Sequence, residues 1–263
     1  MTSIESLDRL HLIWELEKFQ KLSPFHLTRK RLILKLLGTP TEPNMRVLDV
    51  GCGTGDLLPA IAQRRFIIDG LDLSRIALKV AKSKAKDGGV ILADVRHIPI
   101  RSGYYDVAVC SEVLEHVEKD SDVVREIWRI LKANGKAILT APHGEQHWTD
   151  EDAVYGHLRR YSKARFIQLL QANGFLIQSI MCWGFPLAAL FRRFISTPVF
   201  RKRLHKRVSY NRASAFARGL FVLLAFFFVM DELFSGFSFG LGIASKASKA
   251  ERTMYESRAH VFH

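Results

Sequence analysis

Three glycines stand within five positions directly after a short apolar run, in the segment VLDVGCGTGD at residues 47–56. This segment constrains the fold more than any other, because so bare a backbone suits a place where a strand ends and the chain approaches a ligand closely. Backbone N–H groups and the N-terminus of a following helix then face the ligand. The segment therefore predicts a buried strand, a ligand-binding loop and a helix, in that order.

Strand and helix patterns alternate along the chain after residue 45, which predicts a parallel sheet covered by helices on both faces. The expected strands are 46–50, 66–72, 90–94, 104–111, 136–142, 175–183 and 239–247. The expected helices are 56–64, with Pro59 in its first turn, 74–86, opening on Ser74, 121–133, ended by Asn134-Gly135, and 163–174. Apolar residues at helical spacing predict two further helices within 4–37, broken near Ser23-Pro24, before a Pro-rich linker over 38–44.

The glycine spacing argues against a dinucleotide as the ligand. A dinucleotide fold uses G-x-G-x-x-G, whose third glycine packs the helix on the strand. Here the glycines are Gly51, Gly53 and Gly55, and Asp56 stands where the third is required. Because an acidic side chain there would repel a pyrophosphate, a cationic or zwitterionic ligand fits better.

The chain here resembles the class I S-adenosylmethionine-dependent methyltransferases of types 11 and 12. VLDVGCGTGD matches their first motif, and the resemblance covers about residues 40–183 plus the last strand. Asp72 ends the second expected strand, and Asp94 ends the third. Either aspartate alone would also serve as a helix or turn cap. Together with the glycine loop, at three successive strand ends, they favour a ligand site.

The resemblance implies S-adenosylmethionine as the cofactor. It implies that Asp72 accepts both ribose hydroxyls, that Asp94 accepts the adenine amine with Val95 against the ring, and that Asp49 helps to hold the methionyl amino group. Ser111 and Glu112 would line the pocket near the sulfonium, and Cys52 is interpreted as a small loop residue, not a nucleophile. The cofactor-binding residues expected are Asp49, Gly51, Cys52, Gly53, Asp72, Leu73, Asp94, Val95 and Ser111.

The fold class implied is α/β, with a Rossmann-like sheet of seven strands that is parallel except for an antiparallel last strand. Residues 1–40 would form an N-terminal helical cap, and residues 41–183 and 238–250 the cofactor-binding core. The last two strands of the resembled fold are joined by a short connection. The long connection here makes residues 184–237 a helical insert before the last strand.

Four side chains are candidates for the base that an oxygen or carbon acceptor requires: His116, His143, His157 and Tyr161. We assign the catalytic role to His116, His143 and Tyr161. The alternative for His116 is a structural position beside the pocket, and for residues 155–162 a surface helix start. The fourth strand is followed by CSEVLEH and not by an Asn/Asp-Pro-Pro-aromatic motif, which argues against methylation of a nucleobase or amide nitrogen.

The positive charge of the chain is regional. Of 39 Lys and Arg residues, against 26 Asp and Glu, 13 fall between Ala153 and Met230, a stretch with no acidic residue. Nine of those 13 lie in the insert, which also contains eleven consecutive apolar residues at 220–230. That run is too short to span a bilayer, for which about 20 apolar residues are needed.

Three interpretations of residues 184–237 compete: a lid packed on the core, an RNA-binding face, and an interfacial segment on anionic lipid. RNA binding leaves the phenylalanine-rich run unexplained, whereas apolar faces flanked by Lys and Arg suit an anionic membrane surface. We therefore expect a monotopic contact with the inner face of a membrane. The separated Cys52, Cys110 and Cys182 and the absence of a signal-peptide core in residues 1–19 favour a cytoplasmic protein.

The function expected is methyl transfer from S-adenosylmethionine to a lipophilic or membrane-held acceptor, such as a quinone-like, polyprenyl-linked or glycolipid molecule. The first alternative is a soluble small-molecule methyltransferase whose insert is a lid or dimer contact, which leaves homo-oligomerisation open. The second is a non-catalytic binding protein that retains the nucleotide pocket. No metal is predicted, because the cysteines show no metal-ligand spacing.

Overall fold

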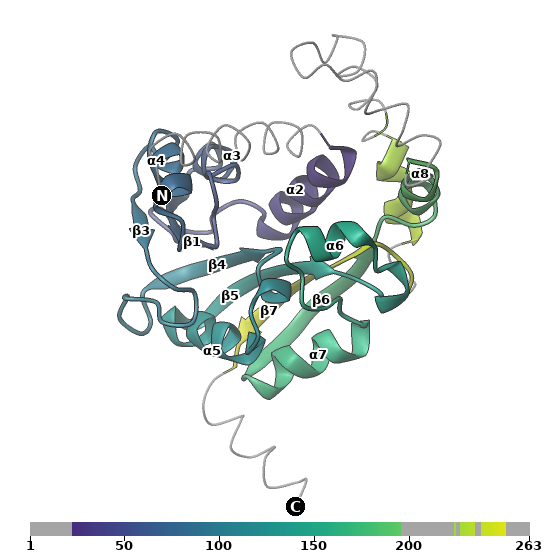
Figure 1. The fold of residues 1–263 in the computed structure, drawn as a ribbon. Helices are drawn as coiled ribbons and strands as arrows, with labels where there is room; N and C mark the ends of the chain where they lie inside the picture. The colour runs from purple at the N-terminus through teal and green to yellow at the C-terminus, as the bar shows by residue number, and fades with distance from the viewer. Residues whose placement is uncertain (1–22, 196–223, 225–226, 235–237, 251–263) are drawn as a thin grey trace, which may run out of the picture. The chain divides into compact units, whose positions relative to one another are not determined.

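The computed structural model describes residues 23–195, 224, 227–234 and 238–250 (Figure 1). The chain divides into two compact units. The sheet unit lies within Ile33–Met181 and Gly242–His263. The second unit, called the smaller unit below, lies within Met1–Leu32 and Cys182–Leu241. The predicted helix before Ser23 and the basic segment 200–208 fall outside the described residues.

Seven strands form one sheet in the order β3-β2-β1-β4-β5-β7-β6. Neighbours from β3 to β5 pair in parallel, and β7 pairs antiparallel to β5. This confirms the predicted seven-stranded α/β sheet with an antiparallel last strand. The strands are β1 Arg46–Val50, β2 Ile67–Asp72, β3 Val90–Leu92, β4 Tyr105–Ser111, β5 Leu131–Pro142, β6 Phe175–Trp183 and β7 Gly242–Lys249.

Helices cover the sheet, with α3 and α4 on one side and α5 and α7 on the other in Figure 1. Ser74 caps α4 as predicted, because its side chain accepts a hydrogen bond from the Ala77 N–H at 3.2 Å. The α-helices are α2 Pro24–Leu37, α3 Leu58–Ala62, α4 Arg75–Lys82, α5 Asp120–Ile130, α6 Asp150–Val154, α7 Lys163–Ala172 and α8 Leu187–Ile195. Short 3₁₀ turns cover Leu114–His116, Glu145–His147 and Phe228–Phe234.

Several predicted boundaries are wrong, including the end of α4, which is Lys82 and not residue 86, and the start of β5, which is Leu131 and not residue 136. Two further cases have a clear cause. Helix α5 ends at Ile130 and not at Asn134-Gly135, because Leu131 is fully buried and already pairs with Tyr105 of β4. Strand β7 begins at Gly242 and not at residue 239, because its pairing with β5 starts at that residue, opposite Pro142. In both places sheet pairing overrides the local pattern.

The smaller unit is organised around the start of α8. Both carboxylate oxygens of Asp231 accept hydrogen bonds from the N–H groups of Leu187 and Ala188, at 2.8 and 2.9 Å. A carboxylate at this position satisfies helix N–H groups that have no partner within the helix. Ala188, Phe228 and Leu241 form a buried cluster, against which Phe25, Ala189 and Phe191 pack. Within the described residues, every helix is too short or too polar to cross a membrane.

Candidate functional site

The glycine loop joins the end of β1 to α3 and is held against β2. The N–H groups of Gly51 and Cys52 both donate to the carbonyl oxygen of Leu71, at 2.7 and 2.9 Å. Gly51, Gly53 and Gly55 have φ values of +75°, +52° and +73°, which side-chain-bearing residues rarely adopt. A Cβ atom on Gly51 would overlap the Val113 side chain, whereas one on Gly53 would meet open space.

Asp72 links the glycine loop to the end of β2. Its Oδ2 accepts a hydrogen bond from the Gly53 N–H at 2.8 Å, and its Oδ1 accepts one from the Ser74 N–H at the same distance. Each carboxylate oxygen can accept a second hydrogen bond. The side chain of Leu73, next to it, is 69% exposed. Asp72 therefore fixes the loop while keeping acceptor capacity for a ligand hydroxyl.

Asp49 is the buried charge of the site. Its side chain is 3% exposed in β1, and burial, followed by repulsion from Asp72 and Asp56, raises its pKa to about 7. A carboxyl group in this state accepts a cationic partner readily, because the partner's charge offsets both the burial and the repulsion.

This pKa predicts a pH-dependent affinity for an ammonium-bearing ligand such as S-adenosylmethionine. Below about pH 7 the carboxyl group is mostly protonated, and binding the cation must first remove that proton, so affinity should rise between about pH 6 and 8. Because the folded-state pKa of about 7 lies above the ordinary value of 3.8, the stability that protonated Asp49 contributes is fully present below about pH 4 and is lost as the pH rises to 7. Calorimetric titrations at pH 6, 7 and 8 measure the affinity, and melting curves between about pH 4 and 8 measure the stability. Asp49→Asn should flatten both trends, and an unchanged pH dependence in this variant would contradict the assignment.

Asp94 follows β3 and forms an ion pair with Arg96. Its two oxygens lie 2.6–3.1 Å from the guanidinium nitrogens of Arg96, and this hydrogen bonding lowers the pKa of Asp94 to about 2. The Arg96 N–H also donates to Asp94 Oδ1 at 2.8 Å. Val95 between them is half-buried. The carboxylate is thus ionised and positioned by Arg96 at the third strand end.

The paired ends of β4 and β5 supply two hydroxyls and a carboxylate. The Ser111 hydroxyl lies 3.0 Å from the Thr140 hydroxyl, which donates to Glu112 Oε1 at 3.0 Å. Glu112 has a φ of +55°, a strained conformation for a non-glycine residue. Such strain is typical of functional sites, where surrounding contacts hold the residue in place. In the glycine loop, burial raises the pKa of the Cys52 thiol, consistent with a loop residue that is not a nucleophile.

The three predicted bases differ in exposure. Tyr161 is fully buried, its hydroxyl donates to Asp120 Oδ2 at 2.8 Å, and burial followed by the Asp120 charge raises its pKa. His143 is 3% exposed, with Nδ1 2.8 Å from the carbonyl oxygen of Tyr161. The His116 side chain is 40% exposed. Among these three, only His116 therefore has a ring open to solvent.

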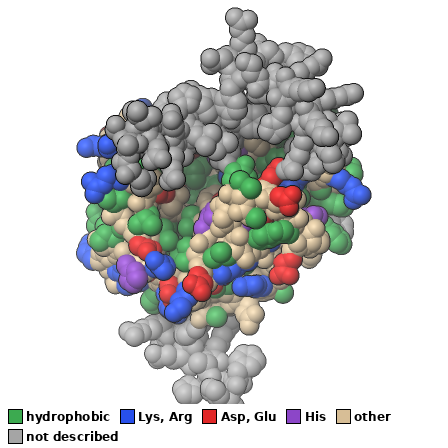
Figure 2. Space-filling view, in the orientation of Figure 1, with side chains coloured by type: hydrophobic (Ala, Val, Ile, Leu, Met, Phe, Trp, Pro, Cys, Tyr) green, Lys and Arg blue, Asp and Glu red, His purple; other side chains and the backbone are tan. Residues whose placement is uncertain are grey.

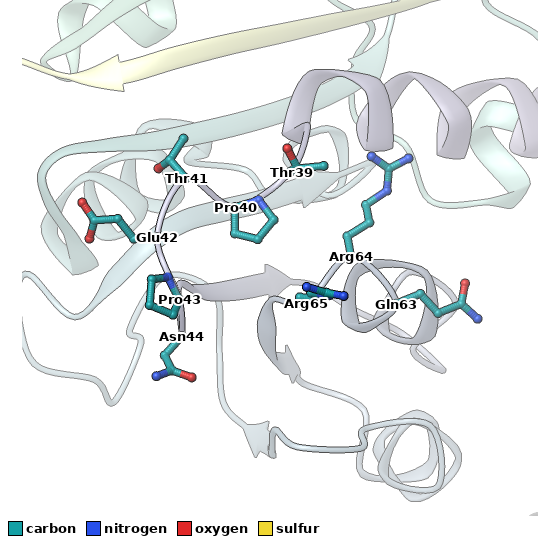
Figure 3. A pocket seen from close by; sticks show the side chains of 9 residues that line it. All are labelled: Thr39, Pro40, Thr41, Glu42, Pro43, Asn44, Gln63, Arg64 and Arg65. Atoms are coloured by element: carbon teal, nitrogen blue, oxygen red, sulfur yellow. The ribbon is translucent and has the colours of Figure 1, made fainter.

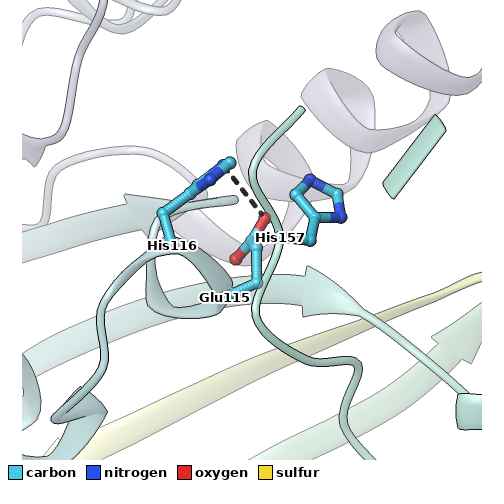
Figure 4. A group of neighbouring side chains, drawn as sticks. All are labelled: Glu115, His116 and His157. Carbon is cyan, nitrogen blue, oxygen red and sulfur yellow. Dashed lines mark ion pairs between the residues drawn. The ribbon is translucent and has the colours of Figure 1, made fainter. Parts of the chain in front are cut away.

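His116 belongs to a cluster with Glu115 and His157 (Figure 4). The two imidazole rings are in edge contact, with centroids 4.9 Å apart. A hydrogen bond from the Leu158 N–H to the Glu115 carbonyl oxygen, at 2.7 Å, holds the two segments together. Sequence reasoning considered His157 singly and missed Glu115. No pattern could have grouped them, because about forty residues separate the two segments.

An open depression lies at the other edge of the sheet (Figure 3). It is formed by the linker that precedes β1 and by the turn that precedes β2, so it lies at the amino ends of these strands. Its lining residues are Thr39, Pro40, Thr41, Glu42, Pro43, Asn44, Gln63, Arg64 and Arg65. Ligands of open parallel sheets bind at the carboxyl ends, so the depression is not the candidate site.

The described surface carries both signs of charge. Figure 2 shows Lys and Arg side chains interspersed with Asp and Glu on the face in view. The surface charge therefore does not locate the candidate site, which is defined by its aspartates and glycines.

Comparison with known proteins gives a consistent result. Residues 48–139 match the family model described as a methyltransferase domain. The chain is 35% identical over 133 residues to the ubiquinone biosynthesis O-methyltransferase of Sodalis glossinidius (strain morsitans), covering 48% of this chain and 53% of that protein. The chain thus spans about half the length of the curated relatives it matches.

Solved structures extend the likeness of the fold. The [4+2]-cyclase SpnF gives a TM-score of 0.59 at 20% identity, covering 86% of this chain and 82% of that one. Phosphoethanolamine N-methyltransferase 2 of Haemonchus contortus, in complex with S-adenosyl-L-methionine, gives 0.59 at 18% identity, covering 87% and 54%. A cyclase and a methyltransferase share this fold, so the reaction must be argued from the site.

Proposed function

We propose that this chain, whose core is a class I S-adenosylmethionine-dependent methyltransferase domain, transfers the cofactor's methyl group to an oxygen atom of a lipophilic, quinone-like acceptor. The observation that carries the proposal is the arrangement of Gly51, Asp49 and Asp72. A bare loop, a buried carboxyl group with a pKa near 7 and a second carboxylate meet at the carboxyl ends of two adjacent parallel strands.

Each group has a role toward the cofactor. Asp49 would neutralise the methionyl ammonium, and Asp72 would accept the ribose hydroxyls through its remaining lone pairs. Asp94 and Val95 would bind the adenine, and the exposed Leu73 would cover it. Ser111, with Gly53 and Cys52 of the loop, would complete the pocket. These assignments keep the positively charged sulfonium close to carboxylates, which favours cation binding.

The cofactor supplies an electrophilic methyl group on sulfonium. In the proposed transfer, a lone pair of the acceptor oxygen would form the new C–O bond while the C–S bond breaks. The electron pair of the C–S bond would stay on sulfur, and S-adenosylhomocysteine would be the leaving group. The hydroxyl proton of the acceptor passes to a base or to water. The protein's part is to align the oxygen behind the methyl group and to exclude water. Of the three predicted bases, His116 is the one whose ring is exposed to solvent.

The quinone-like acceptor is supported by the names of the relatives at about 35% identity, several of which are ubiquinone biosynthesis O-methyltransferases. Methyl transfer is tested by incubating the protein with labelled S-adenosylmethionine and a catechol that carries a short prenyl chain. With the label on the methyl group, we expect a labelled catechol product and an equal amount of unlabelled S-adenosylhomocysteine. Cofactor binding without transfer to any phenolic or lipid fraction would leave a binding protein and reject the proposed reaction.

Membrane contact through residues 184–237 is the second part of the proposal. Among the described residues of this segment, seven large apolar side chains are more than a third exposed: Phe185, Leu187, Leu190, Phe227, Met230, Leu233 and Phe234. The basic side chains of Arg192 and Arg193 follow on α8. Exposed apolar groups beside basic ones suit the interface of an anionic bilayer, at the cytoplasmic face. A soluble enzyme that uses this segment as a lid is the alternative.

Replacing Leu190 and Leu233 together with glutamate is expected to weaken binding to anionic liposomes at least about tenfold. Two apolar contacts are lost, each worth roughly 1.5–3 kcal/mol when fully buried, and two negative charges meet an anionic surface. Flotation with phosphatidylglycerol vesicles measures the effect. Val154→Glu is the matched control, because Val154 is 83% exposed but belongs to the sheet unit. Equal flotation of all three proteins would favour the lid.

A further inference from the structure

We propose that Glu115, His116 and His157 bind a divalent transition-metal ion of the zinc type. Each residue brings one donor atom to the cluster, a carboxylate oxygen or a ring nitrogen, and the three atoms lie within 4.8 Å of one another (Figure 4). Two imidazoles and one carboxylate form a ligand set that zinc and other first-row metals accept in proteins.

Hydrogen bonds fix the protonation of His157. Its Nδ1 lies 2.8 Å from Asp152 Oδ1, and Asp152 accepts from Arg160 through both oxygens, at 2.7 and 2.9 Å. The carboxylate can only accept, so Nδ1 carries the proton and Nε2 keeps its lone pair. Carboxylate–histidine–metal arrangements use this same geometry.

His116 is held in the same way. Its Nδ1 lies 3.3 Å from the carbonyl oxygen of Gly156, which can only accept, and its Nε2 lies 4.0 Å from Glu115 Oε1. A neutral ring that donates from Nδ1 to this carbonyl keeps the lone pair of Nε2 for a metal ion.

Glu115 supplies the negative charge. Its side chain is fully buried in the turn that follows β4. Burying an ionised carboxylate is costly, and a divalent cation between it and two imidazoles would offset that cost. Metal–ligand distances of about 2.0–2.2 Å place the donor atoms around one ion about 3–4 Å apart. Each donor atom would have to move inward by under about 1 Å, through rotation of its side chain, to reach these separations.

The position of the cluster suggests what the ion would do, a role that rests on the proposed function. The turn begins beside Val113, which packs over Gly51 of the glycine loop. The partly exposed ring of His116 leaves one side of the cluster open, as catalytic metal sites require. An acceptor hydroxyl bound there would lose its proton to water more readily, because the ion stabilises the oxyanion. With the ion bound, His116 would serve as a ligand and not as the base. Ion binding itself does not depend on this role.

Ion binding is tested on the full chain after dialysis against a chelator. Titration with Zn²⁺, followed by calorimetry, and with Co²⁺, followed by its visible absorbance, should each show one site per chain. Mg²⁺ and Ca²⁺ should bind far more weakly, since they prefer oxygen ligands. His157→Gln and His116→Gln should each weaken Zn²⁺ binding at least tenfold, and Asp152→Asn about 10–100-fold. His26→Gln, a histidine outside the cluster, should bind as the unmodified chain does.

Two results would overturn the site. The first is no binding of Zn²⁺ or Co²⁺ by the unmodified chain, and the second is that both cluster histidine variants bind Zn²⁺ as tightly as the unmodified chain does. Using two variants protects the test against one that fails to fold. Binding of S-adenosylmethionine is measured in the same samples. An unmodified chain that binds Zn²⁺ but not S-adenosylmethionine would reject the proposed function and keep the metal site. An unmodified chain that binds S-adenosylmethionine but not Zn²⁺ would reject the metal site alone.

Discussion

Replacing Asp72 with alanine is expected to weaken the binding of S-adenosylmethionine at least about 100-fold. The carboxylate would make two hydrogen bonds to the ribose, and hydrogen bonds to charged groups contribute about 1.5–3 kcal/mol each. The same side chain accepts hydrogen bonds from the Gly53 and Ser74 N–H groups, so its removal also loosens the loop. Since 1.4 kcal/mol corresponds to a tenfold change, the two losses together give the expected factor.

Calorimetric titration measures this affinity, with S-adenosylhomocysteine as a second ligand. Asp72→Asn keeps one acceptor oxygen and should fall between the alanine variant and the unmodified chain. Asp106→Ala removes an aspartate that pairs with Lys132 at the amino end of β4, opposite the carboxyl end that carries the candidate site, and should bind normally. Full affinity in Asp72→Ala would remove the ligand assignment, and with it the proposed enzyme.

Gly51→Ala is expected to destabilise the fold and abolish cofactor binding together. At a φ of +75° an alanine costs roughly 1–2 kcal/mol, and the overlap of its Cβ with Val113 adds about 1–3 kcal/mol. In a chain of this size these costs should lower the melting temperature by about 5–15 °C. Melting curves and cofactor titrations measure the two effects on the same protein.

Two matched variants separate backbone strain from overlap. Gly53→Ala also has a positive φ but meets open space, so it should lose only about 1–2 kcal/mol of stability. In the double variant Gly51→Ala/Val113→Ala the overlapping methyl groups are gone, and part of the melting temperature should return relative to Gly51→Ala. No recovery would mean that Val113 does not limit the space above Gly51.

The sheet and the cofactor loop could be predicted because their signals are local. The strand patterns of 46–50 and 175–183 match β1 and β6 to the residue. Parallel pairing then brings Asp49 and Asp72, each placed by its own strand, to one edge of the sheet. The end of α5 and the start of β7 were misplaced, because pairing partners distant in sequence decide them.

The sequence by itself determined that a glycine loop and two aspartates would meet at the carboxyl ends of parallel strands. Strand period and loop composition are sufficient for that, since each acts over a few residues. Only the tertiary structure decided that Val113 closes the space above Gly51, that His143 and Tyr161 are buried, and that His157 joins Glu115 and His116. These contacts join segments up to about sixty residues apart, and their packing depends on the closed fold, which no local pattern encodes.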